Sequence, residues 1–139
     1  MRALMSSISV LKPVSGTFYR GIAAKTEDCA ESYVKGKHSH WTAWSSMSKS
    51  IRRAFDFARG ESARQFGGDE WHIALFVVEC CEVYDFSKLS HYPDEEELVL
   101  QPNTDLEVIH FMEKTKSLTH RKTLQWIFLR AVTGSLTGR

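Results

Sequence analysis

The pattern of hydrophobic and polar positions predicts a chain made mainly of β-strands. Runs rich in β-branched and aromatic residues are typical of strands. In one such run, 105–113, we expect Leu106 and Val108 to face inward, with Ile109 as a further candidate. The runs lie at residues 17–23, 40–46, 71–78, 97–101, 105–113 and 124–132.

Helical spacing of apolar residues occurs in two stretches. Residues 26–35 predict a short helix with Thr26 as its N-cap, and residues 50–64 predict a second helix capped by Ser48 or Ser50. Loops rather than helices separate most of the predicted strands. An α+β fold with a mixed or antiparallel sheet therefore fits better than a doubly wound parallel sheet. The length of 139 residues suits one domain, so we expect residues 1–139 to form a single domain.

Composition and charge argue against several classes of protein. The formal net charge is +1, which predicts neither a nucleic-acid footprint nor a strong attraction to a membrane surface. No apolar run approaches the roughly 20 residues of a membrane helix, and the N-terminal stretch MRALMSSISVLKPV is a poor match to a signal peptide. Cys29, Cys80 and Cys81 do not make a disulfide framework, so we expect buried thiols and a reducing compartment.

The first candidate functional stretch is TFYRG, residues 17–21, which places an arginine between an aromatic residue and a glycine on a predicted strand. Burial of a guanidinium without an anionic partner costs free energy. Arg20 could grip a pyrophosphate or a carboxylate in a bidentate way, while Gly21 would let a ligand approach the backbone. Alternatively, Arg20 is an edge-strand residue that pairs with one of the acids of the chain.

Two further stretches carry hydroxyls and carboxylates. In WTAWSSMS, residues 41–48, Ser46 and Ser48 lie on one side of an extended chain, where they could orient a carboxylate or bind a sugar, or lead into helix caps. In DEEELVLQP, residues 94–102, Glu95 and Glu97 project on the same side of the strand that follows. Two such carboxylates suit a cationic species, for example a developing oxocarbenium ion, or form a solvated acidic loop.

In this order, the three stretches resemble the Arg-Ser-Glu class of mono-ADP-ribosyltransferases, the class of cholera-toxin-like toxins and ecto-enzymes. That family shows aromatic-Arg-Gly, then aromatic-x-Ser-x-Ser, then Glu-x-Glu before a short apolar strand and a proline. The matching residues here are 19–21, 44–48 and 95–102, and SHYPD, residues 90–94, is similar to the loop before the glutamates. The resemblance covers about residues 15–132. Met47 departs from the Thr common in the family, and only 19 residues precede Arg20, so the domain resembles a minimal or excised module.

The resemblance implies two packed sheets around an NAD cleft and a role for each matching residue. Arg20 would clamp the NAD phosphate or the adjacent ribose, and the Gly21 backbone would pair with the nicotinamide amide. Glu97 would be the catalytic carboxylate, which holds the 2′-hydroxyl of the nicotinamide ribose and stabilises positive charge as it develops. Ser46 would hydrogen-bond both Glu97 and that ribose.

The resemblance also implies roles for residues around this centre. Glu95 would orient or deprotonate the acceptor, and a glutamate at this position goes with arginine as the acceptor in the family. Ser48 would brace the turn, and Arg52 or Arg53 would meet the pyrophosphate or belong to a solvated helix face. Tyr92 would contact the acceptor or serve as surface packing.

The function implied is NAD-dependent transfer of ADP-ribose to an arginine of a target protein, by a toxin or effector module. Alternatives are the same site with water or a nucleic acid as the acceptor, or a catalytically silent module that binds NAD or protein. NAD is the co-substrate expected and no metal is expected, since His38 and His40 have no further ligand cluster nearby. The expected partners are a target protein and, for a toxin, an inhibitory or immunity protein, with no membrane and with a cytoplasmic site of action.

Overall fold

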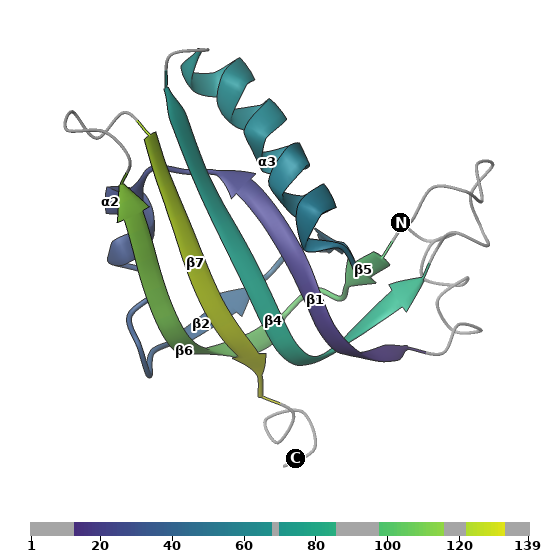
Figure 1. The fold of residues 1–139 in the computed structure, drawn as a ribbon. Helices are drawn as coiled ribbons and strands as arrows, with labels where there is room; N and C mark the ends of the chain where they lie inside the picture. The colour runs from purple at the N-terminus through teal and green to yellow at the C-terminus, as the bar shows by residue number, and fades with distance from the viewer. Residues whose placement is uncertain (1–12, 68–69, 86–97, 116–121, 133–139) are drawn as a thin grey trace.

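The computed structural model of the chain describes residues 13–67, 70–85, 98–115 and 122–132. These residues form a β-rich fold with few helices, which confirms the α+β class (Figure 1). The elements are β1 (Val14–Ala23), α2 (Thr26–Ala30), β2 (His38–Trp41), β3 (Ser45–Met47), α3 (Ile51–Phe66), β4 (Trp71–Asp85), β5 (Leu98–Leu100), β6 (Thr104–Thr115) and β7 (Lys122–Ala131).

The described strands form one mixed sheet in the order β2-β6-β7-β4-β5-β3, with β1 paired to β4. Strand β4 runs parallel to β7 along Trp71–Glu79 and then pairs antiparallel with β5 at Val83–Asp85. The two sheets implied by the resemblance are therefore two arms of one continuous sheet. The first arm contains β2, β6 and β7, the second contains β5 and β3, and β4 belongs to both. They are joined because β4 is long enough to leave one partner strand and take up another.

The short strands β5 and β3 form the second arm, and this arm closes against β1. Strand β3 pairs with β5, and the next residue, Ser48, exchanges both backbone hydrogen bonds with Tyr19 of β1 at 2.7 and 2.8 Å. The strands β1, β4, β5 and β3 thus form a closed ring of backbone contacts. This ring sets the spacing between the strand that carries Arg20 and the strand that carries Ser46.

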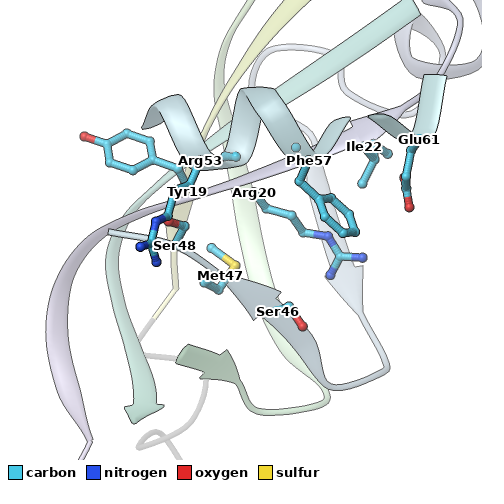
Figure 2. Close-up of a pocket in the computed structure, with 11 residues that line it drawn as sticks. Tyr19, Arg20, Ile22, Ser46, Met47, Ser48, Arg53, Phe57 and Glu61 are labelled. Carbon is cyan, nitrogen blue, oxygen red and sulfur yellow. The ribbon is translucent and has the colours of Figure 1, made fainter. Parts of the chain in front are cut away.

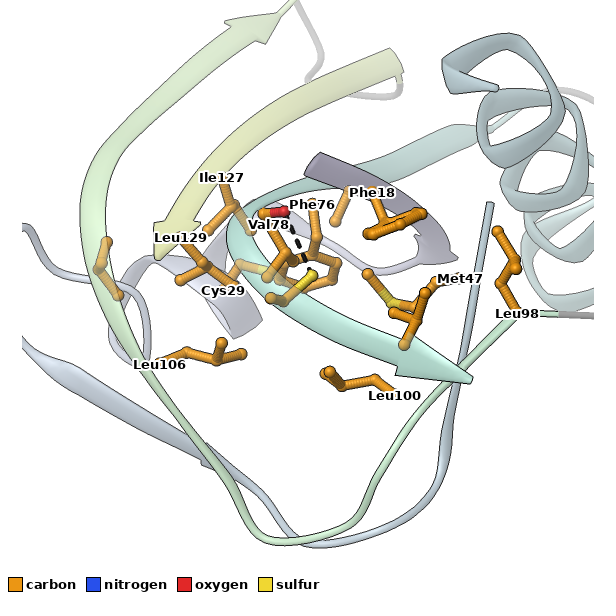
Figure 3. Packing of buried hydrophobic residues seen from close by; sticks show 14 residues of the cluster. Phe18, Cys29, Met47, Phe76, Val78, Leu98, Leu100, Leu106, Ile127 and Leu129 are labelled. Atoms are coloured by element: carbon orange, nitrogen blue, oxygen red, sulfur yellow. Dashed lines mark hydrogen bonds between the residues drawn. The ribbon is translucent and has the colours of Figure 1, made fainter. Parts of the chain in front are cut away.

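Apolar side chains fill the space between the two arms. The main cluster draws on β1, β3, β4, β5, β6 and β7 and includes Cys29 of α2 (Figure 3). Strand β7 illustrates how a strand contributes one face to this core: every second residue from Thr123 to Leu129 is buried. In β6, Leu106 and Val108 are buried as expected, whereas Ile109 is only half-buried at a bulge in the pairing with β7. Cys29 and Cys81 are buried, as expected; the side chain of Cys80 lies outside the described part of the chain.

Helix α3 covers the opposite face of β1 and β4 (Figure 1). Ser50 is its N-cap, since the Ser50 hydroxyl accepts a hydrogen bond from the Arg53 backbone N–H at 3.2 Å, which confirms one of the two predicted caps. Ala54 and Ala58 are buried against the sheet. Their small side chains let the helix approach β1 closely.

The predicted strand 40–46 is wrong as one element. It is split into β2 and β3 because its two ends pair with strands in different arms: Trp41 pairs with Thr104 of β6, and Ser45 pairs with Leu100 of β5. The β5–β6 connection turns at Asn103, which has a φ of 63°. The two bends run side by side, so the position of each depends on the other.

Helix α2 is shorter than the predicted helix 26–35. The backbone N–H groups of Ser32 and Tyr33 both return to the Cys29 carbonyl, and the chain then joins β6 through a 2.8 Å bond from the Gly36 N–H to the Val108 carbonyl. The N-cap is Lys25, with no side-chain cap, so the prediction of Thr26 is wrong. In the described part of the chain, no helix is both long and apolar enough to span a membrane.

Candidate active site

A cavity of about 340 Å³ lies where β1, β3 and α3 meet, and Arg20, Ser46 and Ser48 all line it (Figure 2). These residues come from separate segments of the chain. The closed ring of strands brings them together because Ser48 pairs with Tyr19, the neighbour of Arg20. The fold thus unites the first two of the three stretches singled out in the sequence.

Arg20 points into the space between the arms, on the same side of β1 as Phe18 and Ile22. It stands directly opposite Phe76 of β4 in the strand register. Burial lowers the pKa of the Arg20 guanidinium below its ordinary value, while the nearby Glu61 and Tyr33 act in the opposite direction. Among the described residues, no carboxylate forms an ion pair with Arg20. Within the described ranges, the guanidinium is therefore a partly desolvated cation that has Glu61 nearby but no salt bridge, which favours the binding of an anion.

The short strand β3 presents Ser46 to the cavity. Ser45 and Met47 are buried on either side of it, so the strand alternation leaves Ser46 exposed. The Ser48 hydroxyl accepts a hydrogen bond from the Ser50 backbone N–H at 3.0 Å. This contact braces the turn into α3, as the sequence predicts for Ser48.

Glu95, Glu97 and Tyr92 lie outside the described residues. The described chain resumes at Leu98, the residue that follows Glu97 in the sequence. Leu98 pairs with Met47, which lies between Ser46 and Ser48. The sequence neighbour of Glu97 is thus next to the two serines in the sheet.

The close packing of β1 against α3 explains why residue 21 is a glycine. A Cβ atom on Gly21 would lie 2.0 Å from the Ala54 carbonyl oxygen and 2.9 Å from the Ala58 Cβ. The sequence interpretation attributed this glycine to the approach of a ligand. The side-chain position of Gly21 faces the helix, so packing also requires a glycine here, and Gly21 lines the cavity together with Arg20.

The arginines at the start of α3 differ in position. Arg53 lines the cavity together with Phe57 and Glu61, which follow it at intervals of one helical turn, and Arg52 is not among the lining residues. Of the two arginines considered from the sequence, Arg53 has the better position to meet a bound anion.

A second cavity of about 300 Å³ is also lined by Arg20. Its walls include Tyr33, Trp41 and Phe76, together with polar groups such as His40 and Ser45. Arg20 and Ile22 line both cavities. Arg20 therefore borders one cavity together with Ser46 and Ser48, and another together with Trp41 and Phe76.

Several residues around the cavities were not singled out from the sequence. The Trp41 ring lies 5.6 Å from the Arg20 guanidinium carbon. Phe57 has 59% of its surface exposed although it is a large aromatic residue. Helical spacing from Arg53 could have suggested Phe57 and Glu61, whereas nothing local in the sequence places Trp41 beside Arg20.

His38 and His40, which were considered as metal ligands, lie on β2. His38 contacts Asp105 of β6 at 3.2 Å. Within the described ranges, no three or more His, Cys, Asp and Glu side chains come together as a metal site.

Comparison with known proteins gives no match to a family model and no match to a curated protein sequence. Solved structures do match. Vis, an ADP-ribosyltransferase toxin from Vibrio splendidus, is 20% identical with a TM-score of 0.66, and the match covers 96% of this chain and 56% of Vis. The ADP-ribosyltransferase HopU1 of Pseudomonas syringae is 21% identical with a TM-score of 0.56, over 86% of this chain and 46% of HopU1.

Exoenzyme S from Pseudomonas aeruginosa is 19% identical with a TM-score of 0.58, over 100% of this chain and 59% of that protein. These likenesses show that the chain has the ADP-ribosyltransferase fold, as the sequence predicts. The chain spans about half of the length of these structures.

Proposed function

We propose that this chain is an NAD-dependent mono-ADP-ribosyltransferase module of the Arg-Ser-Glu class, which transfers ADP-ribose from NAD to an arginine of a target protein. The observation that carries the proposal is the meeting of Arg20, Ser46 and Ser48 at one cavity of an ADP-ribosyltransferase fold. Each short motif alone is weak evidence, whereas their convergence in that fold is specific. A role as a toxin or effector is supported by neighbours such as the Vis toxin and the type III effector XopAI.

The position of Arg20 suits a dinucleotide. A pyrophosphate joins two nucleoside halves, and Arg20 lines two cavities and has no ion pair to a described carboxylate. Its fork of N–H donors would hold the phosphates, and Arg53 at the cavity wall would add a second cation. Phe57 offers an exposed ring face for the flat nicotinamide. Exoenzyme S has been crystallised with carba-NAD, which supports NAD as the ligand of this fold.

The proposed chemistry is the cleavage of the nicotinamide–ribose bond. Glu97 would hold the ribose 2′-hydroxyl and stabilise the positive charge that develops on the ribose. Ser46, placed beside the start of β5, would orient the Glu97 carboxylate. Because the carboxylate acts mainly on the transition state, its loss should lower kcat more than it weakens NAD binding.

Arginine is the proposed acceptor because of Glu95. An arginine side chain is protonated at neutral pH and is a poor nucleophile, so a carboxylate near it is chemically required. Vis has been crystallised with agmatine, a compound that carries a guanidino group. Tyr92, in the stretch before the glutamates, is the proposed contact for the target protein.

The test is incubation of the protein with labelled NAD and a cell lysate, followed by measurement of label in protein, in RNA and in free ADP-ribose. Wild-type protein should label protein arginine, and Glu97→Ala should lower every transfer by a factor of about 100 or more. Glu95→Ala should lose arginine transfer and keep part of the NAD hydrolysis. Glu96→Ala is the matched control, because it removes the carboxylate between these two and should keep both activities.

The alternatives are separate outcomes of the same assay. Label in water-soluble ADP-ribose alone would identify an NAD glycohydrolase, and label in RNA would identify a nucleic-acid acceptor. No turnover of NAD by the wild type would refute the enzyme and leave a binding module. Equal loss of transfer and hydrolysis in Glu95→Ala would refute the separate roles of Glu95 and Glu97.

A further inference from the structure

The Arg20 guanidinium lies against the aromatic ring of Trp41. The Arg20 guanidinium carbon lies 5.6 Å from the centre of the Trp41 ring, which is within the range of a cation–π contact. The described residues supply no ion pair to this guanidinium. The Trp41 ring is therefore a direct contact of this guanidinium.

Trp41 itself is fixed by the core. Its ring packs edge-to-face on Phe76, with ring centres 5.2 Å apart and an interplanar angle of 86°. Tyr33 packs on Phe76 in a similar way, at 5.1 Å, and Phe76 is only 2% exposed. The three rings form one rigid unit that borders the second cavity beside Arg20.

Trp41 comes from a different part of the sheet than Arg20. It is the last residue of β2, which pairs with β6, whereas Arg20 lies on β1. The contact between Trp41 and Arg20 therefore links β2, at the end of the sheet order, to β1. The pairing of Trp41 with Thr104 of β6 fixes the backbone that carries this ring.

We propose that Trp41 is a positioning residue for Arg20: its ring holds the guanidinium in the orientation that receives the phosphates of a dinucleotide. This inference rests on the proposed function, since it assigns a role within the same NAD site. A guanidinium stacked on a ring keeps its N–H groups free at its edge, where they can bind two phosphate oxygens. Fixing the orientation in advance also reduces the entropy lost when the ligand binds.

The test is a double-mutant cycle on NAD affinity, measured by titration calorimetry on folded protein. Trp41→Leu should weaken NAD binding by about tenfold, from the usual strength of a partly desolvated cation–π contact. Trp41→Phe keeps a ring face and should restore most of the affinity. Trp126→Leu is the matched control, because Trp126 is half-buried against the cluster under α3 and is not among the residues that line the two cavities.

The cycle separates positioning from general packing. In an Arg20→Ala background, Trp41→Leu should change NAD affinity less than twofold, because the residue through which it acts is gone. If Arg20→Ala binds NAD too weakly to measure, Arg20→Lys replaces it as the background, since lysine lacks the planar group that stacks. In turnover assays, Trp41→Leu should raise KM and leave kcat nearly unchanged.

Three results would overturn the inference. Unchanged NAD affinity in Trp41→Leu would refute the inference. An equal loss of NAD affinity in the presence and absence of Arg20 would also refute it, because this would indicate a structural role only. Both results leave the proposed function intact because the wild type still binds NAD. Failure of the wild type to bind NAD would instead refute the proposed function, and this inference would fall with it.

Discussion

Replacement of Gly21 by alanine is the most direct test of how α3 is held against the sheet. Gly21 lies in β1 beside Arg20, and the added methyl group would sit 2.0 Å from the Ala54 carbonyl oxygen and 2.8 Å from the Ala54 carbonyl carbon. Both atoms belong to the helix backbone, so no side-chain rotation relieves the clash. The helix or the strand must move.

The size of the effect follows from these distances. Favourable contacts between heavy atoms begin near 3.5 Å, so α3 must retreat from β1 by roughly 1 to 1.5 Å. Overpacking of a buried position costs about 1–3 kcal/mol, and a clash with backbone belongs at the upper end of that range. We expect a loss of about 3 kcal/mol in the free energy of unfolding, which corresponds to a fall in Tm of roughly 10 °C.

Urea denaturation, monitored by circular dichroism, measures this loss in the free energy of unfolding. The displaced helix also carries Arg53 and Phe57, so NAD binding should weaken in parallel. The matched control is Gly60→Ala in the same helix, where the nearest atom to a new Cβ is the flexible end of Arg64 at 3.7 Å. That variant should gain about 0.5–1 kcal/mol. A Gly21→Ala protein within about 0.5 kcal/mol of the wild type would refute the packing argument.

Three further predictions concern stability and thiol chemistry. Ser50→Ala removes the cap that accepts from the Arg53 N–H and should cost about 1 kcal/mol in urea denaturation, whereas Ser50→Asp should keep most of it. Thr123→Val removes the 3.0 Å partner of the buried His72 Nδ1 and should cost about 1–3 kcal/mol, with Thr123→Ser near wild type; equal stability of the two variants would contradict this. Burial, with a smaller contribution from the neighbouring acid, raises the pKa of Cys29 to about 11. Iodoacetamide at pH 8 should therefore modify Cys29 far more slowly in native than in unfolded protein, and because the folded pKa is the higher one, the stability due to this thiol should be lost between about pH 8.5 and 11.

Much of the secondary structure could be predicted from local pattern. The alternation in 124–132 and the helical spacing in 50–64 correspond to β7 and α3. Such elements are readable because side-chain direction repeats every two residues in a strand and every 3.6 in a helix. The predicted strand 40–46 failed because its two halves pair with β6 and β5 in different arms, and no local period carries that information.

The site could be predicted in part. Arg20, Ser46 and Ser48 were readable from motif order, and the structure brings them to one cavity. Trp41 was not, because it is ordinary in its own segment. It matters only through its distance from Arg20, which depends on strand pairing.

The sequence by itself determined most of the strands and helices, the apolar faces of the regular ones, and which side chains could carry the chemistry. The tertiary structure decided which segments become neighbours: that β4 exchanges β7 for β5, that β3 closes on β1, and that the Trp41 ring meets the Arg20 guanidinium. The reason is physical. Local sterics set the direction of a side chain, whereas contacts between distant segments depend on the free energy of the whole packed core.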